Sequence, residues 1–153
     1  MKLHPVLFLF LASAALADGP PPLGRWVTES GNLEVDIAPC AAEPPAGALC
    51  GKVVRVLANR SMSAPGEPIQ PADTRPALGM TLLSGLLPAG DGVYKGTIYN
   101  RENAKHYSVK LTPAEPAQLL VRGYVGLPLF GKTQVWRRPA PEAAAEPASG
   151  AAR

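Results

Sequence analysis

Apolar and polar residues alternate in short runs along most of the chain. From Leu33 to Ile37 every second residue is apolar, and the same alternation puts Tyr107, Val109 and Leu111 on one face of a second run. A period of two is typical of strands that pack one face on a core. Since the 3.6-residue period of an amphipathic helix is missing, the pattern predicts an all-β chain.

Gly, Pro and Asn bound these runs, so the expected strands are short and joined mainly by short connections. Antiparallel strands in this order favour an up-and-down β-barrel, which removes exposed sheet edges by closing on itself. A two-sheet sandwich is the alternative. The expected barrel has about eight strands, at residues 24–29, 31–39, 50–58, 78–88, 92–100, 106–113, 117–125 and 131–138.

The interior of this barrel is expected to be aliphatic, which fits a filled core as well as a hollow one. Residues 59–76 carry four prolines and no periodicity, which predicts a long loop, either the lid or rim of a site or a plain surface connection. An apolar guest would lie inside, whereas a polar one would bind at the rim. The expected inward residues are Val35, Ile37, Val109, Leu111, Val121 and Val135.

The beginning of the chain has the pattern of an export signal. Lys2 precedes an apolar run at 6–14, which is too short to span a bilayer, and Ala15-Leu16-Ala17 is a small-x-small cleavage site. We expect a cleaved signal peptide at 1–17, a linker at 18–23, one barrel domain at 24–138 and a disordered Pro/Ala-rich tail at 139–153. The expected location is periplasmic or secreted, with no membrane span.

The charge of the chain argues against nucleic acid as a partner. The formal net charge of +3 falls by one if Lys2 leaves with the signal, and the remaining basic residues are scattered. A monomer is expected, with a small apolar ligand or an envelope protein as the possible partner.

The chain has two cysteines, Cys40 and Cys50, with nine residues between them. In an oxidising compartment two thiols of a small domain usually pair, and here the bond would close a long hairpin loop between adjacent strands. A free reactive thiol and a metal or redox role are the alternatives.

Six motifs stand in a fixed order between residues 24 and 138. They are Gly24-Arg25-Trp26, Ile37-Ala38-Pro39-Cys40, Leu49-Cys50-Gly51-Lys52-Val53-Val54, Gly96-Thr97-Ile98-Tyr99, Tyr107-Ser108-Val109-Lys110-Leu111 and the segment LLVRGYVGLPLFGKTQVWRR. In this order they resemble the bacterial family catalogued as domain of unknown function 2147. The resemblance implies an exported, lipocalin-like β-barrel without an established activity.

The resemblance also implies how the barrel closes. Trp26 on the first strand and Arg138 on the last resemble the pair by which lipocalin-like barrels close, with the cation stacked on the indole face. Arg137 is the competing partner, because alternation puts it on the opposite face from Arg138.

One turn departs from the family pattern. The family often has Asp-Pro-Glu followed by Gly and Lys after Ile-Tyr, whereas this chain keeps Glu102 and Lys105 but has Arg101 and Ala104 at the Pro and Gly positions. Asn103 is the residue expected to supply the left-handed conformation of the missing Gly.

The chain offers no constellation of catalytic residues. His106 is the one histidine after the signal, which excludes a site of several imidazoles, and the acidic residues are dispersed. No catalytic, cofactor-binding or metal-binding residue is therefore nominated and no cofactor is expected. The residues nominated for a rim or ligand site are Tyr99, Arg101, Glu102 and His106.

These observations favour a non-enzymatic binding module for a small apolar ligand or envelope component. The alternative is a periplasmic structural or interaction protein, whose barrel is filled and which acts through its surface. An enzyme is the third and least favoured hypothesis, because the sequence offers no group of residues that would act together in catalysis.

The export signal generates a first prediction. The exported protein should begin at Asp18, because Ala15-Leu16-Ala17 meets the small-residue requirement of signal peptidase. Intact-mass measurement of the periplasmic or secreted fraction checks this. A soluble cytoplasmic chain that retains Met1 would contradict it.

Overall fold

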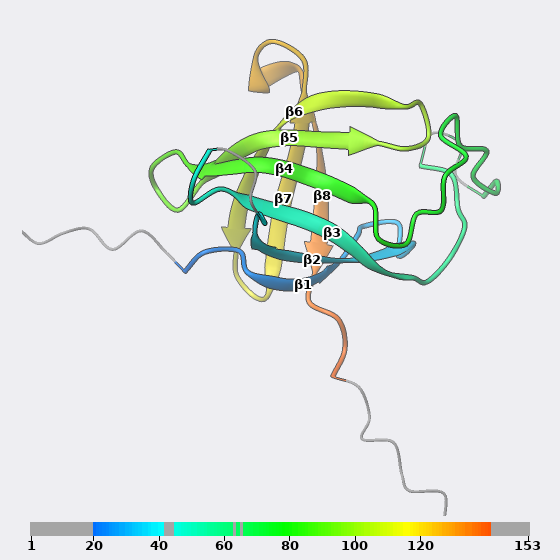
Figure 1. Ribbon diagram of the computed structural model, residues 1–153, viewed down its shortest axis with the longest axis horizontal. Helices are drawn as coiled ribbons and strands as arrows, with labels where there is room; N and C mark the ends of the chain where they lie inside the picture. The colour runs from blue at the N-terminus through cyan, green and yellow to red at the C-terminus, as the bar shows by residue number, and fades with distance from the viewer. Residues whose placement is uncertain (1–19, 42–44, 63, 65, 142–153) are drawn as a thin grey trace, which may run out of the picture.

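The computed structural model describes residues 20–41, 45–62, 64 and 66–141, which form one closed antiparallel barrel (Figure 1). The expected signal at 1–17 and residues 142–153 of the expected tail lie outside the described residues. The elements are β1 (Gly24–Val27), β2 (Leu33–Pro39), β3 (Leu49–Val56), β4 (Thr81–Pro88), β5 (Tyr94–Asn100), β6 (Lys105–Ala114), β7 (Gln118–Tyr124), the 3-10 helix η1 (Pro128–Phe130) and β8 (Lys132–Arg137).

Each strand pairs with the next in chain order, and β1 pairs with β8 to close the sheet. The up-and-down barrel predicted from the alternation is therefore confirmed, and the sandwich is excluded. Because the strands alternate in direction, the four connections 28–32, 57–80, 101–104 and 125–131 gather at one end of the barrel, which we call the open end. The other three connections lie at the opposite, closed end.

Side chains fill the closed half of the barrel. The core contains Val35, Ile37, Leu83, Leu86 and Val109, each at most 1% exposed, with further aliphatic residues and two tryptophans around them. Burial of one such side chain contributes about 1.5–3 kcal/mol, so this half carries most of the hydrophobic stabilisation.

One expected core residue was assigned to the wrong face. Leu119 and Val121 of β7 are buried and pair with Trp136 and Gln134 of β8, so these four residues share the inner face. Val135 pairs with Leu120 and faces outward. The sequence of an isolated strand does not show which face is turned inward, because the register with β7 decides the orientation of β8.

Trp26 and Arg138 are in contact at the closed end. The Arg138 Cζ lies 3.7 Å from the centroid of the Trp26 ring, and its Nη1 donates to the carbonyl oxygen of Arg25 at 3.1 Å. The indole Nε1 donates to the Pro22 carbonyl at 3.0 Å. Partial burial lowers the pKa of the Arg138 guanidinium. That this contact closes the barrel stays a prediction.

A buried carboxylate joins the first three strands. Glu34 of β2 accepts from Arg25 of β1 at 3.1 Å and from Arg55 of β3 at 3.3 Å, although only 3% of its side chain is exposed. Such a group is tolerated inside a protein when cations and hydrogen bonds compensate for its lost hydration. Glu34 therefore adds side-chain contacts to the short strand β1.

The predicted disulfide is confirmed. Cys40 and Cys50 are bonded, with their Cα atoms 4.9 Å apart, where β2 ends and β3 begins. The bond closes the β2–β3 connection at the closed end of the barrel. It also fits a periplasmic or extracellular location, since disulfides persist in oxidising compartments.

The disulfide generates the second prediction. Cys40→Ser should lower the free energy of unfolding by about 2–3 kcal/mol, because the unfolded chain loses its cross-link, and should leave the fold intact. Urea unfolding of this variant beside the exposed control Ala41→Ser measures the difference. Alkylation of both thiols in the unreduced native protein would contradict the disulfide.

Candidate ligand cavity at the open end

A cavity of about 370 Å³ lies inside the open half of the barrel. Its wall is mainly apolar and includes Leu33, Leu82, Ile98 and Val121, with Trp136 against the packed core. The Trp136 Nε1 donates to Gln134 Oε1 at 3.0 Å, so the indole N–H is already paired within the protein. The arrangement suits the apolar part of a small ligand.

A glycine at an inward position leaves room for this cavity. Gly123 follows Leu119 and Val121 on the inner face of β7 and lines the cavity. A Cβ atom at Gly123 would lie 3.7 Å from Ile98 Cγ2, an ordinary contact distance. The space is open because glycine has no side chain. The backbone conformation at Gly123 is also accessible to other residues, since its φ is not left-handed.

The mouth of the cavity is polar. Its residues lie in the four connections at the open end or at the strand ends beside these connections. Its polar residues are Thr28, Ser30, Asn32, Asn59, Asn100, Arg101, Glu102, Lys132 and Gln134. A ligand with one polar group would therefore place that group at the mouth and its apolar part inside.

Asn32 holds two of these connections together. Its Nδ2 donates to the Arg60 carbonyl at 2.7 Å, its Oδ1 accepts from the Arg60 N–H at 3.0 Å, and its own carbonyl accepts from Leu57 N–H at 2.7 Å. Asn32 is only 6% exposed. Asn32 is not among the residues nominated from the sequence, because its one local signal is a polar amide directly before a strand.

The long loop expected at 59–76 lies within the connection 57–80, which crosses to the turn between β5 and β6. Ser61 Oγ donates to Glu102 Oε1, and Met62 N–H donates to Glu102 Oε2 at 3.1 Å. Backbone hydrogen bonds from Ala72 to Glu102 and from Asp73 to Arg101 add to this attachment. Glu102 therefore anchors the loop that borders the cavity.

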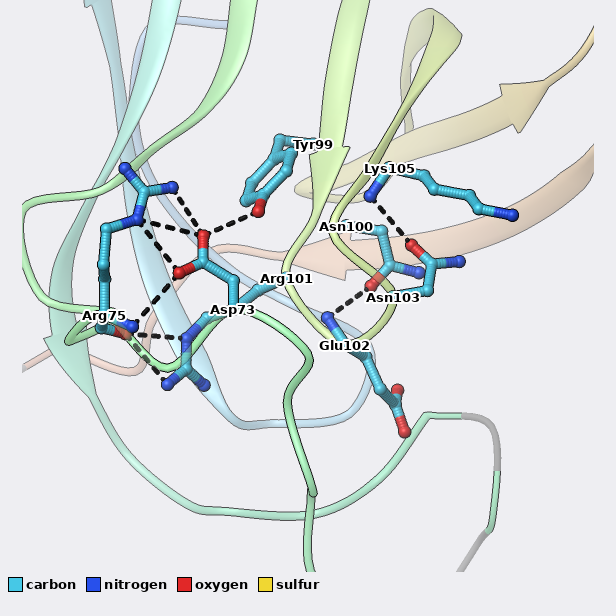
Figure 2. A network of polar contacts seen from close by, with 8 residues as sticks. All are labelled: Asp73, Arg75, Tyr99, Asn100, Arg101, Glu102, Asn103 and Lys105. Atoms are coloured by element: carbon cyan, nitrogen blue, oxygen red, sulfur yellow. Dashed lines mark hydrogen bonds and ion pairs between the residues drawn. The ribbon is translucent and has the colours of Figure 1, made fainter.

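A second attachment is built on Asp73, as Figure 2 shows. Its carboxylate accepts from Tyr99 OH at 2.6 Å and from Arg75 Nε at 2.9 Å, while Arg101 Nε donates to the Arg75 carbonyl at 3.1 Å. The hydrogen bonds from Arg75 and then Tyr99 hold the pKa of Asp73 well below its ordinary value. Conversely, the bond to Asp73 raises the pKas of Arg75 and Tyr99.

The four nominated rim residues divide into two groups. Tyr99, Arg101 and Glu102 line the cavity, whereas His106 does not. His106 pairs with Tyr99 across β5 and β6, with ring centroids 4.7 Å apart. These two residues line a separate hollow with Arg75, Pro76 and residues 78–81. Asp73 and Arg75 carry no local signal in the sequence, because their partner Tyr99 on β5 is distant in the chain.

The turn between β5 and β6 corrects one expectation. Ala104, at the position where the family has Gly, is the residue with the left-handed φ, 55°, and not Asn103. Asn103 instead uses its amide, whose Oδ1 accepts from Lys105 N–H at 3.1 Å and whose Nδ2 donates to Tyr107 OH at 2.7 Å. These two bonds hold the turn while the backbone strain falls on the alanine.

Within the described residues, no three His, Cys, Asp or Glu side chains gather in a way that would hold a metal ion. No described helix has the length and apolar character needed to cross a bilayer.

The network around Asp73 generates the third prediction. The folded-state pKa of Asp73 is lowered, so the ionised carboxylate stabilises the folded protein. This stabilisation is complete above the unfolded-state pKa of about 3.9 and is lost as the pH falls below it. Asp73→Asn should therefore lose less stability than the wild type on acidification from about pH 5 to about pH 2.

Urea unfolding midpoints across this range measure the effect. Asp91→Asn, which removes an exposed carboxylate at the closed end, controls for the loss of one negative charge. Parallel acid profiles for Asp73→Asn and the wild type would contradict the prediction.

The chain is similar to a solved structure and to a bacterial family. The solved structure is described as protein HP1028 from the human pathogen Helicobacter pylori, which belongs to the lipocalin family. The two sequences are 19% identical, and the superposition covers 77% of this chain and 82% of that protein, with a TM-score of 0.52. At this identity the likeness shows the fold alone. No curated protein matches the chain. A family model described as an uncharacterized protein conserved in bacteria (DUF2147) matches residues 24–138. This match spans most of the chain, and the protein therefore belongs to the DUF2147 family, with a lipocalin-like β-barrel fold.

Proposed function

We propose that this protein is an exported, non-enzymatic binding module that holds a small apolar ligand in the open half of its barrel. The cavity of about 370 Å³ carries this proposal, since its volume lies within the range of about 300–1,000 Å³ that small-molecule sites occupy. The disulfide supports an oxidising compartment as the place of action.

The lining of the cavity defines the ligand class further. Leu33, Ile98, Val121 and Trp136 offer apolar contacts to the part of the ligand that lies deepest. The amides of the mouth and the ammonium group of Lys132 would contact a polar or anionic end group. A small amphiphile with a short apolar chain or ring system fits both regions.

The alternative of a filled barrel applies to one half of the molecule. Leu49, Leu86 and Leu119 fill the closed half, so substitutions there test packing only. Substitutions that test ligand binding must lie in the open half, where Gly123 leaves space.

The fourth prediction fills this space. Gly123→Phe should remove at least about nine-tenths of the binding of N-phenylnaphthylamine, an apolar fluorescent probe, because the new ring would occupy the cavity. Folding should survive, since the Cβ at Gly123 makes an ordinary contact and its backbone needs no left-handed conformation. Fluorescence titration of the probe, beside thermal unfolding of both proteins, measures the two effects.

Leu120→Phe is the matched control, because Leu120 lies on the outer face of the same strand, opposite Val135. The control should bind the probe as the wild type does. Unchanged binding by a folded Gly123→Phe protein, or no binding by the wild type, would overturn the cavity as a ligand site.

A further inference from the structure

The connection between β7 and β8 exposes an unusual amount of apolar surface. Val125, Leu127, Leu129 and Phe130 are 72%, 62%, 78% and 77% exposed, and they lie within six consecutive residues. We call residues 125–130 the apolar loop. Single exposed apolar residues are common on protein surfaces, but a contiguous group of four marks an interaction site.

The apolar loop is held in one shape by hydrogen bonds from the half-buried Arg122. Arg122 Nε donates to the Pro128 carbonyl at 2.5 Å, its Nη2 donates to the Leu129 carbonyl at 3.2 Å, and its Nη1 donates to Thr133 Oγ1 at 2.7 Å. Gly131 lets the loop return closely to β7, because a Cβ there would lie 2.5 Å from the Gly123 carbonyl oxygen. The four side chains are thus presented by a fixed backbone.

The apolar loop projects at the open end of the barrel. Figure 1 shows η1 standing out beyond the ends of the neighbouring strands. None of its four apolar side chains lines the cavity, yet Lys132 and Gln134, which follow directly in the chain, do. The loop is therefore a convex tip beside the mouth of the cavity.

The strands that carry this tip are basic. Between residues 105 and 138 the charged side chains are Lys105, Lys110, Arg122, Lys132, Arg137 and Arg138, against the single carboxylate of Glu115. Glu115 lies in the turn between β6 and β7, and Arg137 and Arg138 stand where β8 ends, so all three are at the closed end. At the open end, Glu102 lies in the turn before β6, and Glu29 accepts from Val135 N–H of β8 at 3.2 Å. Lys105 and Lys132 stand where β6 and β8 begin, at the open end and on either side of β7.

We propose that the protein docks on an anionic phospholipid surface by inserting the apolar loop between the lipid headgroups. A convex apolar tip needs a deformable apolar medium, and basic side chains around it are attracted to anionic headgroups. A protein partner would instead need a matching groove. Docking in this position brings the mouth of the cavity to the membrane. An apolar ligand would then pass from the lipid into the cavity, or back, without crossing water.

Vesicle flotation tests this docking. The full exported chain should float with vesicles of phosphatidylglycerol and phosphatidylcholine, and less with phosphatidylcholine alone or at high salt. The double variant Leu129→Ser/Phe130→Ser should lower the partition coefficient by at least about tenfold, since two large apolar side chains no longer enter the lipid.

The matched control is Leu23→Ser/Leu87→Ser, which replaces two exposed leucines, 39% and 37% exposed, at the closed end. It should float as the wild type does, and thermal unfolding should show that both double variants are folded. Equal flotation of the wild type and Leu129→Ser/Phe130→Ser would overturn the proposal, as would no flotation of the wild type.

Sedimentation velocity addresses the other occupant, a second copy of the chain. Self-association that Leu129→Ser/Phe130→Ser abolishes, without flotation of the wild type, would assign the loop to a dimer and overturn the lipid proposal. Docking does not depend on the proposed ligand: a protein that binds N-phenylnaphthylamine but does not float overturns this inference alone.

Discussion

The closure of the sheet between β1 and β8 is the constraint on which the rest of the structure depends. Within the described residues a single backbone pair, Val27 with Arg137, joins these strands. The stack of Arg138 on Trp26 and the pairing of Arg25 with Glu34 add side-chain contacts to the short strand β1. The pairing of β1 with β8 leaves the sheet without a free edge, and free strand edges are where sheets pair with other chains.

Closure also limits the interior. A barrel of eight strands is just wide enough for side chains to fill it or for one small ligand. In this protein both outcomes occur along one axis: aliphatic residues fill the closed half, whereas Gly123 leaves the open half hollow. The ligand site is thus a property of a few side-chain volumes, and the connections at the mouth border it through the anchors at Asn32, Asp73 and Glu102.

Much of the fold was predictable from local signals. A period of two and frequent Gly and Pro residues identified the strands, and two cysteines at the ends of neighbouring strands identified the disulfide. The face of β8 was predicted wrongly at Val135, because an isolated strand does not reveal its register with β7. The left-handed residue at Ala104 was also missed, since side-chain preference favoured Asn103.

The sequence by itself determined the fold class, the family and the covalent cross-link, because alternation, ordered motifs and cysteine spacing are local properties of the chain. Only the tertiary structure decided that Asp73, Arg75 and Tyr99 form one network and that the open half is hollow. The physical reason is that these features depend on contacts across the barrel. Asp73 reaches a strand 26 residues away, and the volume left at Gly123 depends on Ile98, which comes from a different strand.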